Sequence, residues 1–170
     1  MNSVVVMGVA GCGKSSVAQK IAQTLGLALI EGDEFHSEHN QKKMRQGLPL
    51  TDADRADWLT NLGLALAQHQ GGAVLTCSAL KRAYRDYLRS LVPDLRFVFL
   101  EIDPVTARRR VTARAGEHLF PPSLVESQFA TLESPVGESG VLRLDATLPL
   151  TTVSESAVQW LRAEPEQKTA

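Results

Sequence analysis

This sequence of 170 residues has few cysteines, few long apolar runs and almost no excess of charge of either sign. Its two cysteines, Cys12 and Cys77, are too few for a disulfide framework, so we expect reduced thiols. The absence of a secretory signal then favours a cytoplasmic protein. No apolar run is long enough to cross a bilayer, which argues against a membrane protein. The 18 basic and 19 acidic side chains give a net charge of −1, which excludes a broad basic field for nucleic acid.

Short apolar segments alternate with longer amphipathic segments, a pattern typical of an α/β protein. We expect strands over 3–9, 27–30, 73–77, 96–102 and 141–144. We expect helices over 15–25, 33–46, about 52–70, 81–89, 104–114, 123–132 and 152–161. Strands that are apolar along their length form a parallel sheet covered on both faces. The sequence therefore predicts a three-layer α/β/α fold with a central five-stranded parallel sheet, as one domain over 1–163, and a disordered tail over 164–170.

A glycine-rich segment follows the first predicted strand. Residues 8–15 read Gly-Val-Ala-Gly-Cys-Gly-Lys-Ser, which fits the phosphate-binding pattern G-x-x-x-x-G-K-[ST]. The glycines let backbone N–H groups turn toward a phosphate, and the following helix points its positive end at the same spot. We expect Lys14 to contact the β- and γ-phosphates of ATP and the Ser15 hydroxyl to bind Mg²⁺. The predicted ATP-binding residues are Gly8, Val9, Ala10, Gly11, Cys12, Gly13, Lys14, Ser15, Ser16 and Arg110.

A P-loop alone is shared by GTPases, motor and transport ATPases, and small-molecule kinases. The chain is short and lacks the N-K-x-D motif with which G proteins read guanine. Its third predicted strand is followed by Ser78-Ala79-Leu80, without the acidic residue that many P-loop ATPases place there. A carboxylate for magnesium must then come from elsewhere, and the nearest candidates are Glu31 and Asp33 after the second strand.

Polar residues after the second strand predict an acceptor site. Asp33 follows Gly32, and its carboxylate at the lip of the sheet can accept the proton of an attacking hydroxyl, cap a helix, or do both. His36, Asn40 and Lys43 are spaced to share one helical face. Such a face either presents donors to a polyol or is simply solvated.

Three further cations are candidates for binding an acceptor carboxylate. Arg55 can form a bidentate pair with it, or can pair with Asp52 or Asp54. Lys81 and Arg85 lie one turn apart near a helix start, where cations do not stabilise the helix. This indicates that they serve an anion, either the substrate carboxylate or the phosphate being transferred. The predicted substrate-binding residues are Asp33, His36, Arg55, Lys81 and Arg85.

A basic helix precedes an irregular segment that contains glycine and prolines. Arg110 and Arg114 fall on one face of this helix, next to a predicted mobile lid over about 115–122. In phosphoryl transfer, a closing lid that places arginine on the developing charge supplies much of the catalysis. The alternative is a helix that forms surface ion pairs. The predicted catalytic residues are Lys14, Asp33 and Arg114.

Taken together, these motifs resemble the gluconokinase family of small P-loop kinases, which is related to shikimate kinases and more distantly to adenylate kinases. Besides the P-loop, the resemblance rests on Gly32-Asp33-x-x-His36-x-x-x-Asn40-x-x-Lys43-Met44-x-x-Gly47-x-Pro49-Leu50-x-Asp52-x-Asp54-Arg55-x-x-Trp58-Leu59, Cys77-Ser78-Ala79-Leu80-Lys81-x-x-Tyr84-Arg85 and Ser127-Gln128-Phe129-Ala130-Thr131-Leu132-Glu133. The chain departs from the family pattern near the lid. The family usually has histidine directly after the glycine that corresponds to Gly116, whereas here Glu117 intervenes. His118 is therefore not counted among the site residues.

The resemblance implies the P-loop kinase fold. It also implies a cytoplasmic, homodimeric kinase that converts ATP and D-gluconate to ADP and 6-phospho-D-gluconate with Mg²⁺. Two alternatives stay open. One is another small-metabolite kinase, similar to shikimate kinases, although those enzymes usually carry a glycine cluster where this chain has residues 77–81. The other is an ATP-binding module without catalysis, against which the intact Lys14, Ser15 and Asp33 argue.

Overall fold

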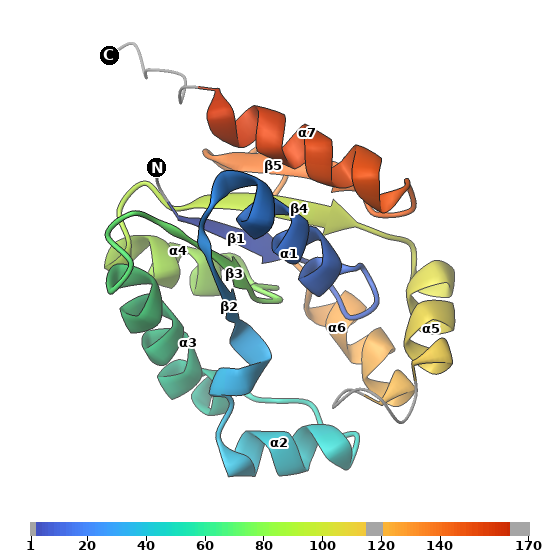
Figure 1. Ribbon diagram of the computed structural model, residues 1–170. Helices are drawn as coiled ribbons and strands as arrows, with labels where there is room; N and C mark the ends of the chain where they lie inside the picture. The colour runs from blue at the N-terminus through green and yellow to red at the C-terminus, as the bar shows by residue number, and fades with distance from the viewer. Residues whose placement is uncertain (1–2, 115–120, 164–170) are drawn as a thin grey trace.

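Five parallel strands form the centre of the protein in a computed structural model that describes residues 3–114 and 121–163. The strands are β1 (Val4–Met7), β2 (Ala28–Glu31), β3 (Ala73–Thr76), β4 (Arg96–Glu101) and β5 (Val141–Asp145). Their order in the sheet is β2-β3-β1-β4-β5, and each neighbouring pair is parallel. The predicted five-stranded parallel sheet is therefore confirmed (Figure 1).

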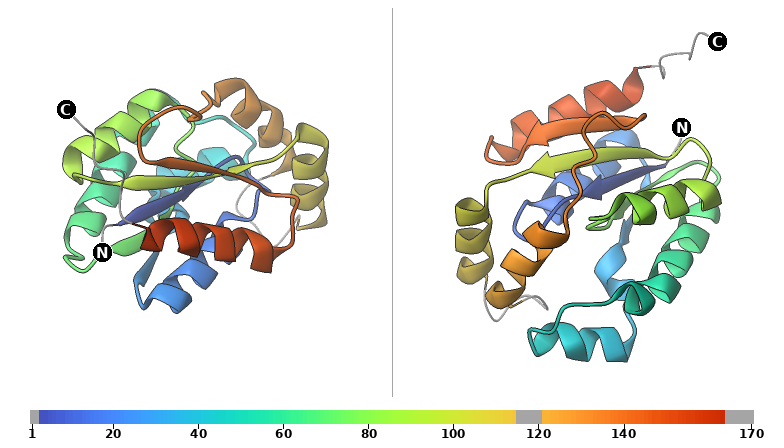
Figure 2. Two further views of the ribbon diagram at one scale, coloured as in Figure 1. Left: turned by 90° about the horizontal axis from the view of Figure 1, so that it is seen from above. Right: turned by 180° about the vertical axis from the view of Figure 1, so that it is seen from behind.

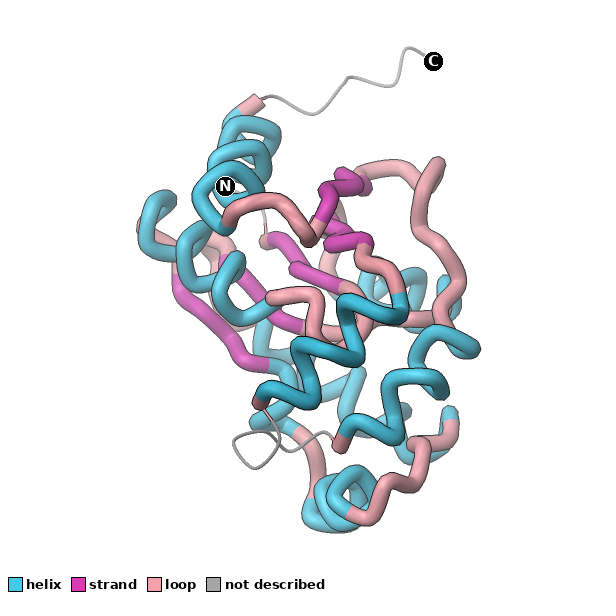
Figure 3. The backbone as a smooth tube through the Cα atoms, turned by 90° about the vertical axis from the view of Figure 1, so that its right-hand side faces the viewer, coloured by secondary structure: helices cyan, strands magenta, loops and turns pink. Residues whose placement is uncertain are grey.

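Helices cover both faces of the sheet. On one face lie α1 (Lys14–Leu25) and α7 (Leu150–Arg162), and on the other lie α3 (Asp52–Ala67) and α4 (Arg82–Leu91), as the left view of Figure 2 shows. The remaining helices, α2 (Glu38–Arg45), α5 (Pro104–Ala113) and α6 (Val125–Thr131), extend beyond the carboxyl ends of the strands. Figure 3 shows the strands enclosed by helices, which is the predicted three-layer arrangement.

The alternating side chains of β1 explain why the protein has an apolar core on each side of the sheet. Val4 and Val6 pack into a core with α1 and α7, whereas Val5 and Met7 pack into a second core with α3 and α4. All four side chains are fully buried. A strand buried on both faces has no polar side, which is why these strands are apolar without interruption.

The single helix predicted over 33–46 is wrong. A 3-10 helix, η1 (Gly32–Phe35), comes first, and His36 is then extended (φ −67°, ψ 137°). Ser37 begins α2 as its N-cap, because its side chain accepts a hydrogen bond from the Asn40 N–H at 3.1 Å. His36 therefore precedes α2 and is not part of the helical face predicted for His36, Asn40 and Lys43. Asn40 and Lys43 do share a face of α2, where both contact Asp54 of α3.

Within the described ranges, no helix is both long and apolar enough to cross a membrane. Both cysteines are free and buried. Most of the predicted lid (115–120, with His118) and the predicted tail (164–170) lie outside the described residues. A second 3-10 helix, η2 (Pro122–Leu124), leads directly into α6, so the predicted 123–132 helix begins as a 3-10 turn.

Candidate active site

The glycine-rich segment 8–15 forms the turn between β1 and the N-terminus of α1. Gly8 has φ 145°, and a Cβ atom on it would lie 2.8 Å from the Leu100 carbonyl oxygen. Gly11 has φ 82°, and a Cβ atom there would lie 2.7 Å from the Ala107 carbonyl oxygen. Larger residues would push the loop away from β4 and α5. The glycines thus allow the backbone to wrap tightly at a helix N-terminus, where a phosphate binds best.

Lys14 curls over this loop from the first turn of α1. Its Nζ donates to the carbonyl oxygens of Gly8 at 3.0 Å and Val9 at 3.1 Å. Cys12 is buried beneath the loop with its Sγ 3.8 Å from the same ammonium group. Ser16 is exposed on the first turn of α1, next to Ser15. The loop therefore holds a full positive charge at the end of a helix dipole.

Ser15 lies beside a carboxylate at the end of β2. Its hydroxyl donates to Glu31 Oε2 at 3.1 Å, and the Thr76 hydroxyl donates to the same oxygen at 2.7 Å. Thr76 in turn accepts from the Gly32 N–H at 3.1 Å. Of the two carboxylates that the sequence offers for magnesium, Glu31 is the one that adjoins Ser15. A hydroxyl and a carboxylate, completed by waters and phosphate oxygens, fit the oxygen-rich octahedral shell that Mg²⁺ prefers.

A pocket opens between the P-loop, the end of β3, η1, α3 and α6. It brings together residues from segments far apart in the sequence. Nine of the predicted site residues line it: Ala10, Gly11, Gly13, Lys14, Ser15, Asp33, His36, Arg55 and Arg114. Apolar side chains of the 48–50 loop close another side of the pocket. An acceptor bound here would therefore meet the P-loop lysine, a carboxylate and an arginine at once.

Asp33 and His36 form one wall of this pocket. The Asp33 side chain is 59% exposed, and its Oδ1 lies 3.9 Å from His36 Nε2. The His36 ring is buried and stacks on Trp58, with ring centroids 4.2 Å apart and planes 16° from parallel. Trp58 Nε1 donates to the Gly32 carbonyl oxygen at 2.8 Å, which fixes η1 against α3. Burial lowers the pKa of His36, and the nearby Asp33 charge opposes this effect.

Arg55 lies on α3 and also lines the pocket. Its Nη1 donates to the Leu50 carbonyl oxygen at 2.7 Å and to the Tyr84 hydroxyl at 3.3 Å. Its guanidinium also lies 5.5 Å from the centre of the Tyr84 ring. In the described part of the chain, the hydrogen bonds of Arg55 use only Nη1. The other edge of the guanidinium is therefore available to a carboxylate.

The prediction that Arg85 binds the acceptor is wrong. Arg85 is fully buried, and its Nη2 pairs with Glu138 at 2.6 Å. Its Nη1 donates to the carbonyl oxygens of Ala79 and Leu80, and Nη2 also donates to the Glu133 carbonyl oxygen. The anion that Arg85 serves is thus an internal glutamate, and the arginine ties the turn after β3 to the segment before β5.

Lys81 is also directed away from the acceptor. Its ammonium pairs with Asp52 at 2.9 Å, and it does not line the pocket. The same Asp52 carboxylate accepts a hydrogen bond from the Tyr84 hydroxyl. These two hydrogen bonds lower the pKa of Asp52, with the bond from Tyr84 as the larger cause. Of the three cations predicted for the acceptor carboxylate, only Arg55 lines the pocket.

The two predicted lid arginines have different surroundings. Arg114 lines the pocket. Arg110 donates to the Gly11 carbonyl oxygen at 3.3 Å and to the Ala146 carbonyl oxygen at 3.0 Å, so it adjoins the P-loop. Arg108 forms the surface ion pair that the alternative interpretation expected, with Glu126 at 2.6 Å.

Sequence reasoning missed Gln128 as a site residue. It lies on α6 and lines the pocket, and its Oε1 accepts a hydrogen bond from the Ala10 N–H of the P-loop at 2.8 Å. The only signal was its place in the Ser127–Glu133 motif that carries the family resemblance. Nothing in the local sequence indicates a contact with a residue 118 positions away.

A phosphate-binding loop at the carboxyl edge of this parallel sheet, joined to a pocket with a carboxylate and arginines, defines a small P-loop kinase. A family model described as an AAA domain matches residues 4–135. A gluconokinase from Gluconobacter oxydans (strain 621H) is 44% identical over 166 residues, which cover 95% of this chain and 92% of that protein. The chain belongs to the gluconokinase family.

Solved structures agree with this placement. The crystal structure of a gluconokinase from Sinorhizobium meliloti 1021 matches with a TM-score of 0.86 at 45% identity, covering 94% of this chain and 91% of that one. The structure of a sugar kinase from Janibacter sp. HTCC2649 matches with a TM-score of 0.89 at 40% identity, covering 97% of this chain and 96% of that one.

Proposed function

We propose that this protein is a gluconokinase, which transfers the γ-phosphate of ATP to the 6-hydroxyl of D-gluconate and yields ADP and 6-phospho-D-gluconate. The observation that carries the proposal is that the P-loop Lys14, the carboxylate of Asp33 and the guanidinium of Arg55 line the same pocket. These three groups match the phosphate, the reacting hydroxyl and the distal carboxylate of the reactants. Family membership supports the same acceptor.

The P-loop binds the nucleotide. Backbone N–H groups of residues 8–15 surround the phosphates, and Lys14 leaves its loop carbonyls for the β- and γ-phosphate oxygens. Ser15 and Glu31 together would hold Mg²⁺, which would neutralise negative charge on the phosphates during the transfer. Arg110, beside the P-loop, and Arg114, in the pocket, supply further positive charge to the transferred group.

Asp33 prepares the acceptor. Its exposed carboxylate accepts the proton of the 6-hydroxyl, or orients that hydroxyl in line with the γ-phosphate. Little covalent chemistry is left to the protein in such a transfer, so orientation and charge supply most of the rate. Asp33 is therefore assigned the role of base or orienting group.

Arg55 selects an acid over a neutral sugar. Gluconate carries its carboxylate about five carbons from the reacting hydroxyl, so the cation that binds it must lie away from the P-loop lysine. Arg55 comes from α3 and keeps one guanidinium edge available for this purpose. The nearby Tyr84 and Leu50 hold that guanidinium in place.

A panel of acceptors tests the proposal. ADP release is measured with D-gluconate, glucose and shikimate under identical conditions, and D-gluconate should give by far the highest kcat/KM. Preference for shikimate would favour the shikimate-kinase-like alternative, and ATP binding without turnover of any acceptor would favour the non-catalytic module. The family resemblance also supports a cytoplasmic homodimer, and light scattering on the purified protein tests the dimer.

A further inference from the structure

Asn40 is a buried polar residue that the mechanism above does not use. It lies in the first turn of α2 and is only 3% exposed. Its side-chain Nδ2 lies 2.8 Å from the Asp54 carbonyl oxygen on α3 and 3.4 Å from His36 Nδ1. One amide group thus joins α2, α3 and the histidine of the pocket wall.

The direction of these hydrogen bonds follows from chemistry. A backbone carbonyl oxygen has no hydrogen and can only accept, so the Asn40 atom that faces Asp54 must be the NH₂ group. The same NH₂ group faces His36 Nδ1, so that ring nitrogen must be the acceptor. A neutral histidine that accepts at Nδ1 carries its proton on Nε2.

The surroundings of His36 favour the same state. Trp58 stacks on the ring and holds its plane, and burial lowers the pKa of His36. Two charged groups also influence this ring: Asp33 raises its pKa and Arg55 lowers it. An imidazolium would place a proton on Nδ1 against the Asn40 NH₂ group, where two donors would face each other. A neutral ring avoids this conflict.

We propose that Asn40 is a positioning residue that holds His36 neutral and protonated at Nε2, so that this N–H is a hydrogen-bond donor beside Asp33. The Nε2–Oδ1 distance of 3.9 Å is too long for a direct hydrogen bond, so the Nε2–H is left for an acceptor hydroxyl that binds next to Asp33. A neutral donor orients these groups without the positive charge that would make Asp33 a weaker base. This role in transfer rests on the proposed function, whereas the position of the proton does not.

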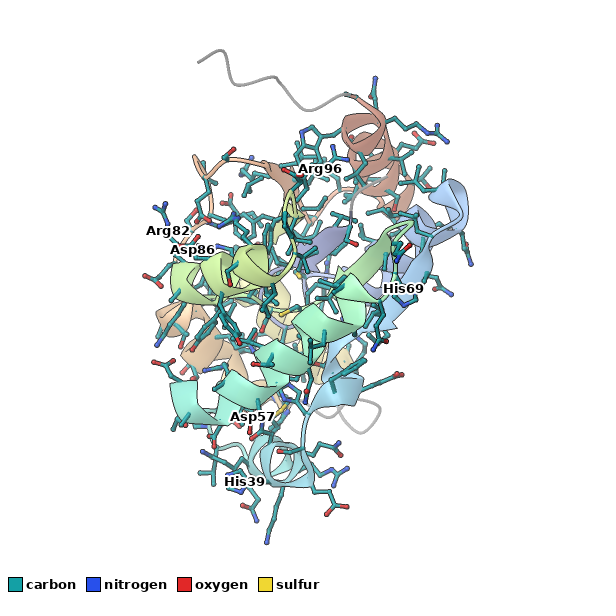
Figure 4. The ribbon with its side chains drawn as sticks, turned by 90° about the vertical axis from the view of Figure 1, so that its left-hand side faces the viewer. His39, Asp57, His69, Arg82, Asp86 and Arg96 are labelled. Atoms are coloured by element: carbon teal, nitrogen blue, oxygen red, sulfur yellow. The ribbon has the colours of Figure 1, made fainter. Side chains whose placement is uncertain are left out.

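The position of the proton can be measured directly in the wild-type protein. Two-bond ¹H–¹⁵N correlation spectra distinguish a ring protonated at Nε2 from one protonated at Nδ1 and from an imidazolium. The chain has four histidines, and the signal of His36 is the one missing from a His36→Gln variant. Figure 4 shows His39 on α2 and His69 beyond α3, both on the surface.

We expect a neutral His36 with its proton on Nε2 at pH 7. A ring protonated at Nδ1, or an imidazolium, would overturn the proposal without any variant being made. Activity is not part of this measurement. A wild-type protein with the expected ring but no turnover of gluconate would therefore contradict the proposed function and support the assignment of the proton.

Two replacements of Asn40 test its role in positioning. Asn40→Asp keeps the size but presents only acceptors, so it should move the His36 proton to Nδ1 or charge the ring, and lower kcat more than tenfold. Asn40→Ala removes the donor and should give a mixture of tautomers, with a fall in kcat of about two- to tenfold, as expected for the loss of one neutral hydrogen bond. The KM for ATP should change little in both variants.

Gln41→Ala is the matched control. Gln41 is also an amide on α2 that contacts His36, but its Nε2 donates at 3.0 Å to the backbone oxygen rather than to the ring. It should leave the ring spectrum and kcat unchanged. Two results would overturn the proposal and show that Asn40 acts only through the fold. One is a His36 ring spectrum in Asn40→Asp that is the same as in wild type. The other is a fall in kcat in Gln41→Ala as large as that in Asn40→Ala.

Replacements of His36 itself give a second test that does not depend on whether the Asn40 variants fold. The amide nitrogen of glutamine reaches close to the place of Nε2, whereas that of asparagine reaches only the place of Nδ1. His36→Gln should therefore retain a clearly higher kcat than His36→Asn. Equal values, or the reverse order, would show that a donor at Nε2 is not what the site needs.

Discussion

Replacement of Arg55 by methionine separates recognition of the acceptor carboxylate from every other function of the pocket. Methionine keeps the apolar length of the side chain and removes the charge. In the structure, Nη1 of Arg55 is committed to Leu50 and Tyr84, so the free edge of the guanidinium is what a carboxylate would use. A charge-assisted hydrogen bond of this kind is worth about 1.5–3 kcal/mol. At about 1.4 kcal/mol for each factor of ten, its loss should raise the KM for gluconate roughly 10- to 100-fold.

The assay is a coupled measurement of ADP with gluconate and ATP varied in turn, and with glucose as an acceptor that lacks the carboxylate. The KM for ATP and the weak activity on glucose should stay near their wild-type values. Lys81→Met is the control, because Lys81 pairs with Asp52 and does not line the pocket. It should change the KM for gluconate less than about twofold. An unchanged KM for gluconate in Arg55→Met, or a rise of the same size in Lys81→Met, would refute this assignment.

Three further predictions follow from single contacts. Asp33→Asn keeps the size of the side chain, so it should lower kcat by about 10²–10⁴-fold with little effect on ATP affinity measured by titration calorimetry; a loss under tenfold would mean that Asp33 is not the base. Arg85→Met should lower the free energy of unfolding by about 3–5 kcal/mol in urea denaturation, because it leaves the carboxylate of Glu138 buried without its main partner; a change near zero would contradict this. Burial raises the pKa of the Cys77 thiol to about 12, so Cys77 should resist iodoacetamide at pH 8 in the native protein and react in urea. Peptide mass spectrometry measures the alkylation, and fast alkylation of the native thiol would contradict its burial.

Much of the fold could be predicted from the sequence because the strands are apolar on both faces. Val4–Met7 is a run of buried residues without a polar position, which only a sheet covered on both sides accommodates. The P-loop was equally clear, since its glycines and Lys14 occur at fixed spacing between a strand and a helix. Both signals are local, and for that reason they can be recognised from one sequence.

The break at His36 was missed because the polar residues of 33–46 fit a helix about as well as they fit the observed structure. The side chain of Ser37 decides the outcome by capping α2, and Trp58 holds His36 outside the helix by stacking on its ring. The second of these contacts is tertiary. Helical spacing alone therefore placed His36 on the same helical face as Asn40 and Lys43, although His36 lies before the helix.

Arg85 was assigned to the acceptor for a similar reason. Its charge near the start of α4 indicated an anion of the reactants, but the anion is Glu138, which lies 53 residues away in the sequence. Fully buried arginines are rare, so a surface or ligand role was the natural expectation. The structure also shows that the half-buried Lys81 has a partner of its own in Asp52.

The central claim is that this chain makes 6-phospho-D-gluconate, and identification of the product tests it most directly. Purified protein is incubated with ATP, Mg²⁺ and D-gluconate, and the product is analysed by ³¹P NMR and by oxidation with 6-phosphogluconate dehydrogenase. The account predicts one new phosphate monoester on the 6-carbon, formed in equal amount with ADP and fully oxidised by that enzyme, and none of it with Lys14→Ala. ADP formed without this ester, or an ester that the dehydrogenase does not accept, would contradict the account.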